Sequence, residues 1–155
     1  MQIQILSPMD PLWNELMDYA ENCSWRAGKR LAQEMRAGNF TGWERVLAAV
    51  EESRIAGYCT VARTDCIPDL PYTPFIGYLF VGEAHRGARL SQRLIQRAMD
   101  YLGDLGFDRV YLVSDHENLY EKYGFRAIDA RMAPWGAMEK IYVRSLEPKE
   151  GGQQP

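Results

Sequence analysis

One stretch decides the fold: YLFVGEAHRGARLS, residues 78–91. An apolar strand ends there in a short glycine-containing loop, and the loop opens into a helix whose first turn carries arginines and small residues. Unpaired N–H groups and the macrodipole at the start of a helix attract phosphate, and small residues let the backbone approach it closely. The stretch therefore predicts an anion cradle. A second stretch, NLYEKYGF at 118–125, follows at the distance that one further strand requires.

Composition limits the classes of protein that this chain can belong to. Its 155 residues predict one domain over 1–146, followed by a disordered polar tail at 147–155. A net charge of −3 lacks the basic footprint of a nucleic-acid binder, so we expect phosphate recognition to be local and no nucleic-acid partner. No targeting or membrane-spanning segment is visible, which predicts a cytoplasmic protein without a membrane partner.

The few potential metal ligands point away from a metal site. Three cysteines without C-x-x-C spacing argue against both a disulfide framework and zinc. The two histidines, His85 and His116, lie apart in the sequence and lack partners at ligand spacing. We therefore expect no metal.

Apolar periodicity predicts seven strands and four helices in an α/β fold, with helices on the faces of a mixed sheet. The segment 64–74 holds three prolines and predicts a loop, whereas the apolar run 75–81 predicts a central strand. Asp10 is the predicted N-cap of the first helix, with Pro11 in its first position. We expect strands at 2–6, 43–50, 55–63, 75–81, 109–114, 125–132 and 138–145, and helices at 11–20, 25–36, 90–105 and 118–123.

Two motifs in this order resemble those of the GNAT N-acetyltransferase superfamily. Residues 86–91, RGARLS, are similar to its phosphate-binding Q/R-x-x-G-x-G/A, although Arg89 replaces a glycine and Ser91 the final glycine or alanine. Residues 119–125, LYEKYGF, resemble the family's L-Y-x-K-x-G-F closely. The resemblance extends from Gln2 to about Ser145, and it implies a mostly antiparallel twisted sheet of about seven strands, splayed between the fourth and the fifth.

The same resemblance implies a site for acetyl-CoA. Main-chain groups of the fourth strand would pair with the pantetheine arm, and a β-bulge there would explain why the ladder opens. We expect Arg89 to have a helical, negative φ, and to add a charge-assisted contact to phosphate. Arg93 and Arg97 are better interpreted as the solvated face of the helix. The expected cofactor-binding residues are Leu79, Phe80, Val81, Arg86, Gly87, Ala88, Arg89, Leu90, Ser91 and Asn118.

Tyr120 matches the family's tyrosine and is the expected general acid for the leaving thiolate, the alternative being a packing role for its ring. Asp115, His116 and Glu117 are candidate general bases, the alternatives being a polar turn or a water chain that removes the proton. Asn118 is also the simplest N-cap of the short helix.

The resemblance thus predicts an N-acetyltransferase that moves an acetyl group to the primary amine of a small molecule by direct attack. The alternatives are a peptide or protein acceptor, or an acyl-CoA-binding sensory module without turnover. Acids and aromatic rings in the flanking segments would favour a cationic amine, unless they are solvated or packing residues. We expect the acceptor near Trp25, Asp65, Asp69 and Tyr72, and a homodimer is possible.

Overall fold

The computed structural model describes residues 1–147, and the chain divides into two compact units. The first unit comprises Met1–Val61 and Tyr78–Ala98, and the second comprises Ala62–Gly77 and the chain from Met99 onward. One domain over 1–146 stays a prediction. The predicted disordered tail lies outside the described residues, apart from its first residue, Glu147.

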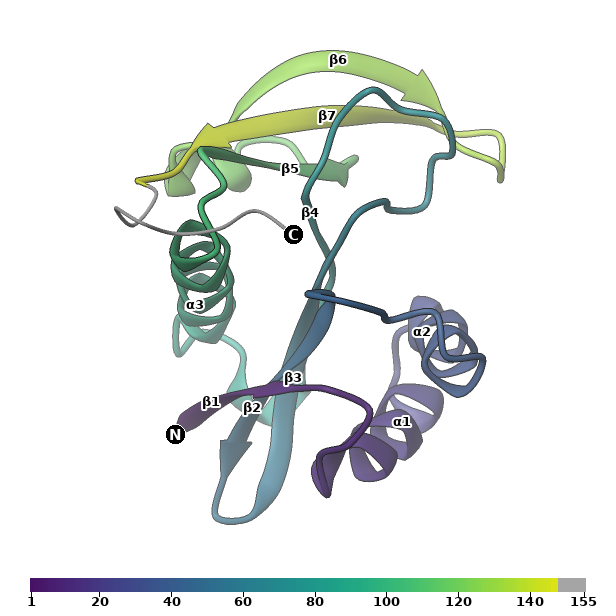
Figure 1. The fold of residues 1–155 in the computed structure, drawn as a ribbon, viewed down its shortest axis with the longest axis vertical. Helices are drawn as coiled ribbons and strands as arrows, with labels where there is room; N and C mark the ends of the chain where they lie inside the picture. The colour runs from purple at the N-terminus through teal and green to yellow at the C-terminus, as the bar shows by residue number, and fades with distance from the viewer. Residues whose placement is uncertain (148–155) are drawn as a thin grey trace. The chain divides into compact units, whose positions relative to one another are not determined.

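The described residues form a seven-stranded sheet in the order β1-β2-β3-β4-β5-β7-β6 (Figure 1), which confirms the predicted fold class. The pairs β1–β2, β2–β3, β5–β7 and β6–β7 are antiparallel, and β4 with β5 is parallel. The registered β4–β5 ladder holds one pair, Phe75 with Tyr111, so the predicted splay between these strands is confirmed. The strands are β1 (Gln2–Leu6), β2 (Arg45–Glu51), β3 (Arg54–Ala62), β4 (Phe75–Val81), β5 (Arg109–Ser114), β6 (Arg126–Met132) and β7 (Met138–Ser145).

The described residues contain three α-helices rather than the four predicted. They are α1 (Leu12–Asn22), α2 (Ala27–Arg36) and α3 (Leu90–Asp104), and a short 3₁₀ helix η1 (Glu83–His85) precedes α3. The fourth predicted helix is the 3₁₀ helix η2 (Tyr120–Tyr123). Gly124 takes the left-handed conformation at φ +87° directly after it, so the segment is too short to develop α-helical bonding.

The predicted start of α1 is wrong by one position. Pro11, not Asp10, occupies the N-cap position, and the helix begins at Leu12. The Asp10 carboxylate instead accepts hydrogen bonds from the backbone N–H of Ser7 at 2.7 Å and from the Ser7 hydroxyl at 3.1 Å. Asp10 therefore closes the turn before the helix, because its side chain accepts hydrogen bonds from the residue three positions earlier.

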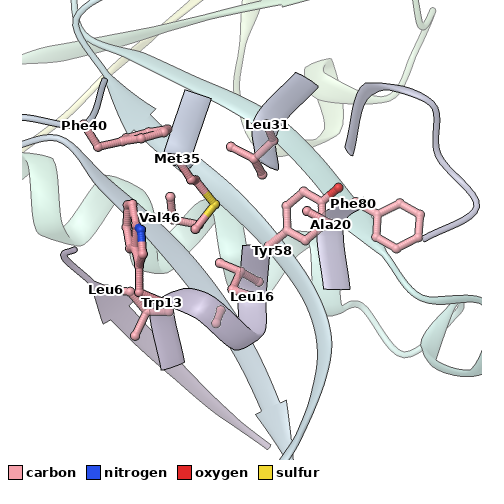
Figure 2. Close-up of a cluster of buried hydrophobic side chains, with 11 residues drawn as sticks. Leu6, Trp13, Leu16, Ala20, Leu31, Met35, Phe40, Val46, Tyr58 and Phe80 are labelled. Carbon is pink, nitrogen blue, oxygen red and sulfur yellow. The ribbon is translucent and has the colours of Figure 1, made fainter. Parts of the chain in front are cut away.

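The core of the first unit lies between α1, α2 and one face of β2 and β3 (Figure 2). Its members are Leu6, Trp13, Leu16, Ala20, Leu31, Met35, Phe40, Val46, Ala48, Tyr58 and Phe80. The other face of β3 meets α3, because the thiol of Cys59 donates to the carbonyl oxygen of Leu94 at 3.9 Å. Burial raises the pKa of Cys59 to about 12, as expected of a core thiol.

The second unit has a sheet of β5, β7 and β6 with two distinct faces. One face carries the cluster of Phe75, Tyr111, Ile141 and Val143, against which Tyr72 packs. On the other face Tyr142 is fully buried beside η2. Within residues 1–147, no helix combines the length and apolar character that a membrane crossing requires.

Candidate active site

The expected phosphate cradle lies in the first unit, where β4 leads through η1 into α3. Gly87 has a φ of +86°, and a Cβ built on it would meet no atom within 4 Å. The backbone N–H of Arg93 donates to the carbonyl oxygen of Arg89 at 3.2 Å and closes the first turn of α3. The amides of the residues just before Arg93 thus belong to the helix start, where an anion is favoured.

Arg89 has a φ of +58°, so the expected negative φ is wrong. The residue immediately before α3 must turn the chain from the Gly87 loop into the helix, and it does so in the left-handed region. That conformation favours glycine, the residue that the family motif carries at this position. The chain therefore keeps the backbone of a glycine while carrying an exposed arginine.

Arg86 folds back over the end of β4. Its Nε donates to the carbonyl oxygen of Val81 at 3.2 Å, its guanidinium carbon lies 5.9 Å from the centre of the Phe80 ring, and Nη2 lies 3.7 Å from Glu83 Oε1. The side chain is more than half exposed, so these contacts are individually weak. The guanidinium stays available to an anion at the cradle.

β4 departs from regular strand geometry beside the residues expected to pair with pantetheine. Tyr78 has a φ of +48°, a conformation of the kind that bulges introduce. Gly57 of β3 lies so close to β4 that an added Cβ would come within 2.6 Å of the Phe80 carbonyl oxygen. Leu79 and Val81 are half-buried, and Phe80 is buried.

Trp25, an expected acceptor residue, belongs to an aromatic cluster of the first unit. Its ring stacks on Phe80 at 6.1 Å with an interplanar angle of 4°, and it meets Tyr78 edge-on at 6.3 Å. Tyr58 of β3 contacts the same two rings, Trp25 and Phe80, and burial raises the pKa of its phenol well above the ordinary value. The neighbouring Ser24 hydroxyl donates to Glu83, which lowers the pKa of that carboxyl.

Tyr120, the expected general acid, lies in the second unit. Only 8% of the residue is exposed, and its ring contacts Tyr123, Phe125 and Tyr142 at centroid distances of 5.9–6.4 Å. Asn118 is not the N-cap of the short helix, because Leu119 holds that position, and Asn118 has a φ of +60°. A left-handed residue cannot share the extended geometry of an N-cap.

The three candidate bases follow β5, and all are exposed. The backbone N–H of His116 donates to the Ser114 hydroxyl at 3.0 Å, and the Tyr142 hydroxyl donates to the His116 carbonyl oxygen at 3.1 Å. These bonds fix the backbone after β5 while leaving the side chains of Asp115, His116 and Glu117 in solvent.

The remaining acceptor candidates lie on the 64–74 loop, in the second unit. The Tyr72 ring stacks on Tyr111 at 4.9 Å, and its hydroxyl donates to Asp129 Oδ2 at 3.0 Å, a bond that raises the pKa of the phenol. Asp65 is half-buried, and Asp69 is exposed with a φ of +61°. Cradle and Trp25 thus belong to one unit, and Tyr120, the candidate bases and the other acceptor residues to the other.

Sequence reasoning missed one titratable residue, Glu139 of β7. It is 8% exposed, and burial raises the pKa of its carboxyl, with a further contribution from the charge of Asp115. The signal was present in the sequence, because period-two alternation places residue 139 on the same face as the core residues Ile141 and Val143. Among the described residues, no group of three His, Cys, Asp or Glu side chains could hold a metal.

A protein-family model described as "Acetyltransferase (GNAT) family" matches residues 9–125. Because the match covers more than half of the sequence, the chain belongs to the GNAT acetyltransferase family. A comparison with curated protein sequences gave no match.

Solved structures share the fold at low sequence identity. An aminoglycoside 6'-N-acetyltransferase complexed with coenzyme A is 18% identical, with a TM-score of 0.70 over 96% of this chain and 99% of that chain. The aminoglycoside 6'-N-acetyltransferase from Enterococcus faecium is 18% identical, with a TM-score of 0.71 over the same shares. A GNAT family acetyltransferase from Elizabethkingia anophelis with acetyl-CoA bound is 15% identical, with a TM-score of 0.66 over 94% and 97%.

Proposed function

We propose that this chain transfers the acetyl group of acetyl-CoA to the primary amine of a small molecule by direct attack. The observation that carries the proposal is the early end of the β4–β5 ladder, which holds the single pair Phe75–Tyr111. Beyond that pair the main chain of Leu79–Val81 runs into the Arg86–Ser91 cradle within one unit. A strand edge that leads to an anion site suits a ligand with an amide-bearing arm and phosphate groups.

Acetyl transfer requires a neutral amine, a polarised thioester carbonyl and a proton for the thiolate. In this proposal a backbone N–H of Leu79–Val81 faces the carbonyl oxygen, and the cradle holds the phosphates. The amine nitrogen forms a bond to the acetyl carbon, the carbon–sulfur bond breaks, and the Tyr120 hydroxyl protonates the departing sulfur. The amine's proton goes to His116, Glu117 or Asp115, or to water.

Two observations favour turnover on a small amine over the alternatives. The tyrosine of the L-Y-x-K motif is retained as Tyr120, which a module that only binds acyl-CoA would not need. Related folds include proteins named aminoglycoside 6'-N-acetyltransferases, and this similarity supports a small-molecule acceptor here. A peptide acceptor remains the competing hypothesis. A cytoplasmic location and a homodimer stay predictions.

The test is release of free thiol from acetyl-CoA in the presence of separate amines: alkylamines, diamines, aryl-alkylamines, aminoglycosides, amino acids and peptides with free N-termini. We expect thiol release that depends on a small amine, with the acetylated product identified by mass spectrometry. Tight acetyl-CoA binding without turnover on any amine would favour the sensory module. Turnover on peptides alone would favour the peptide acetyltransferase.

A further inference from the structure

One carboxylate oxygen of Glu83 has two partners from different parts of the first unit. Glu83 begins the 3₁₀ helix η1, and its Oε1 accepts a hydrogen bond from the hydroxyl of Ser24 in the α1–α2 loop, residues 23–26. The same Oε1 lies 3.7 Å from Nη2 of Arg86, the first residue of the cradle. This oxygen thus connects the loop that carries Trp25 with the proposed phosphate site.

The two partners of this oxygen are unequal. A charge-assisted bond between a guanidinium and a carboxylate is about 2.7–2.9 Å long. The separation of 3.7 Å therefore leaves Arg86 and Glu83 as an ion pair without a hydrogen bond, and both side chains are more than half exposed. Of the groups that lower the pKa of the Glu83 carboxyl, Ser24 has the largest effect and the charge of Arg86 the smallest. Ser24 is therefore the partner that holds this carboxylate.

The backbone of η1 is fixed by contacts that do not involve the α1–α2 loop. His85 Nε2 lies 2.7 Å from Glu51 Oε2 of β2. The backbone N–H of Gly82, just before η1, donates to the carbonyl oxygen of Ala56 in β3 at 2.8 Å. These contacts tie η1 to β2 and β3. A change at Ser24 should therefore turn the carboxylate side chain without displacing the backbone that leads into the cradle.

We propose that Ser24 is a positioning residue for the cofactor, because it holds Glu83 away from Arg86 and leaves that guanidinium to the phosphates of coenzyme A. The inference rests on the proposed function, in which the cradle holds the phosphates. Without the Ser24 bond, Oε1 can form a direct charge-assisted pair with Arg86 and compete with phosphate. Because coupling between two sites is reciprocal, an acceptor that moves the 23–26 loop changes the affinity for coenzyme A, and coenzyme A changes the affinity for that acceptor.

The experiment is a double-mutant cycle on the affinity for coenzyme A, measured by calorimetric titration of coenzyme A into the full chain at neutral pH. We expect Ser24→Ala to weaken binding by about threefold, since the released carboxylate pairs with Arg86. Glu83→Gln should tighten binding by about threefold, since it removes the competing charge and keeps a side chain that can accept from Ser24. Ser24→Ala added to Glu83→Gln should then leave the affinity unchanged.

Glu15→Gln on the exposed face of α1 is the matched control, because it removes the same charge from the same unit. It should bind coenzyme A as the wild type does. The cycle separates positioning from a general structural effect. A structural effect of Ser24→Ala would weaken binding equally with and without Glu83→Gln, and misfolding would not tighten binding in Glu83→Gln.

Three results would overturn the positioning role: an unchanged affinity in Ser24→Ala, an unchanged affinity in Glu83→Gln, or an equal loss from Ser24→Ala in both backgrounds. Each of these, in a wild type that binds coenzyme A, leaves the proposed function intact and refutes this inference alone. A wild type that does not bind coenzyme A refutes the proposed cofactor site and the inference with it.

Discussion

At the scale of single residues, Tyr120 carries the proposed chemistry in one hydroxyl group. Tyr120→Phe keeps the ring that packs on Tyr142 and Phe125 and removes only the proton donor. We expect kcat to fall by about 10²-fold or more, with little change in the affinity for acetyl-CoA, because general acid catalysis contributes about 10²–10⁴-fold. Steady-state kinetics and calorimetry measure the two quantities.

Tyr123→Phe is the control for that substitution, because Tyr123 lies on the same short helix and contacts the Tyr120 ring. It should leave kcat within a factor of about two, since its hydroxyl has no place in the proposed transfer. Undiminished turnover in Tyr120→Phe would assign Tyr120 to packing and the proton to water.

Arg89 makes a second prediction possible, through its left-handed backbone. Arg89→Gly removes a strained conformation that costs about 1–2 kcal/mol but adds about 0.5–1 kcal/mol of chain entropy on unfolding, so the net free energy of unfolding should stay equal or rise slightly. Arg93→Gly, four residues later inside α3, should lower it by about 1 kcal/mol. Urea denaturation of both variants compares them, and a clear loss in Arg89→Gly would contradict the backbone assignment.

The sequence could not have revealed all of these residues. Tyr120 could be identified because its motif is local. The end of the short helix could be predicted because glycine readily adopts the left-handed conformation that ends a helix, as Gly124 does here. The φ values of Arg89 and Asn118 depend on how the loops before α3 and before η2 lead into those helices, which residue type alone does not specify. Period-two alternation indicates the face on which Glu139 lies, but the degree of its burial depends on β5 and β6, which pair with β7 only in the folded sheet.

At the scale of secondary-structure elements, the β4–α3 connection should dominate acetyl-CoA binding. Reversing the charge of both Arg86 and Arg89 to glutamate replaces attraction to phosphate by repulsion at the start of α3. We expect acetyl-CoA affinity to fall by well over about tenfold, as measured by calorimetry. The matched control reverses the charges of Arg93 and Arg97, which lie within α3. It changes the net charge of the protein by the same amount.

An unchanged affinity for acetyl-CoA in a folded Arg86→Glu/Arg89→Glu protein would refute the assignment of its phosphates to this cradle. A similar loss in both double variants would show that net charge, rather than the position of the loop, governs binding. Circular dichroism separates either result from misfolding.

The end of the β5–β7 ladder predicts a pH dependence of stability. The pKa of Glu139 is raised above its ordinary 4.5, so the folded state holds this proton more tightly than the unfolded chain does. Stability from this group is present below pH 4.5 and is lost as the pH rises through the folded pKa. Glu139→Gln should therefore be more stable than the wild type at neutral pH, and the gain should shrink toward pH 4. Urea unfolding across pH, with Glu15→Gln as control, measures this difference.

Elements were the level at which the sequence was most informative. β4, β5 and β7 begin and end where predicted. In β4 and β5 the largely buried residues read as nearly continuous apolar segments. Helix ends were less certain. Pro11 stands one position earlier in α1 than predicted, and the four residues of η2 are too few for an α-helical hydrogen-bond ladder.

At the scale of the whole molecule, neither unit is a continuous piece of chain. β4 and α3 each contribute residues to both units, with the divisions after Gly77 and after Ala98. An element cannot unfold in one half without losing hydrogen bonds in the other, so we expect a single cooperative transition. Differential scanning calorimetry should give equal calorimetric and van't Hoff enthalpies. Two resolved transitions would contradict the prediction of one domain.

The same discontinuity has a consequence for how the chain is made. A ribosome releases Ala62–Gly77 before it has synthesised β5 and β7, the strands on which Tyr72 and Phe75 pack. The first unit can fold as soon as residue 98 has left the ribosome. The apolar side chains of Ala62–Gly77 stay exposed to water until β5 and β7 have been synthesised. A nascent chain stalled between α3 and β7 therefore exposes the apolar side chains of this loop after the first unit has been synthesised. We expect a chaperone at the exit tunnel to bind these exposed side chains during that interval.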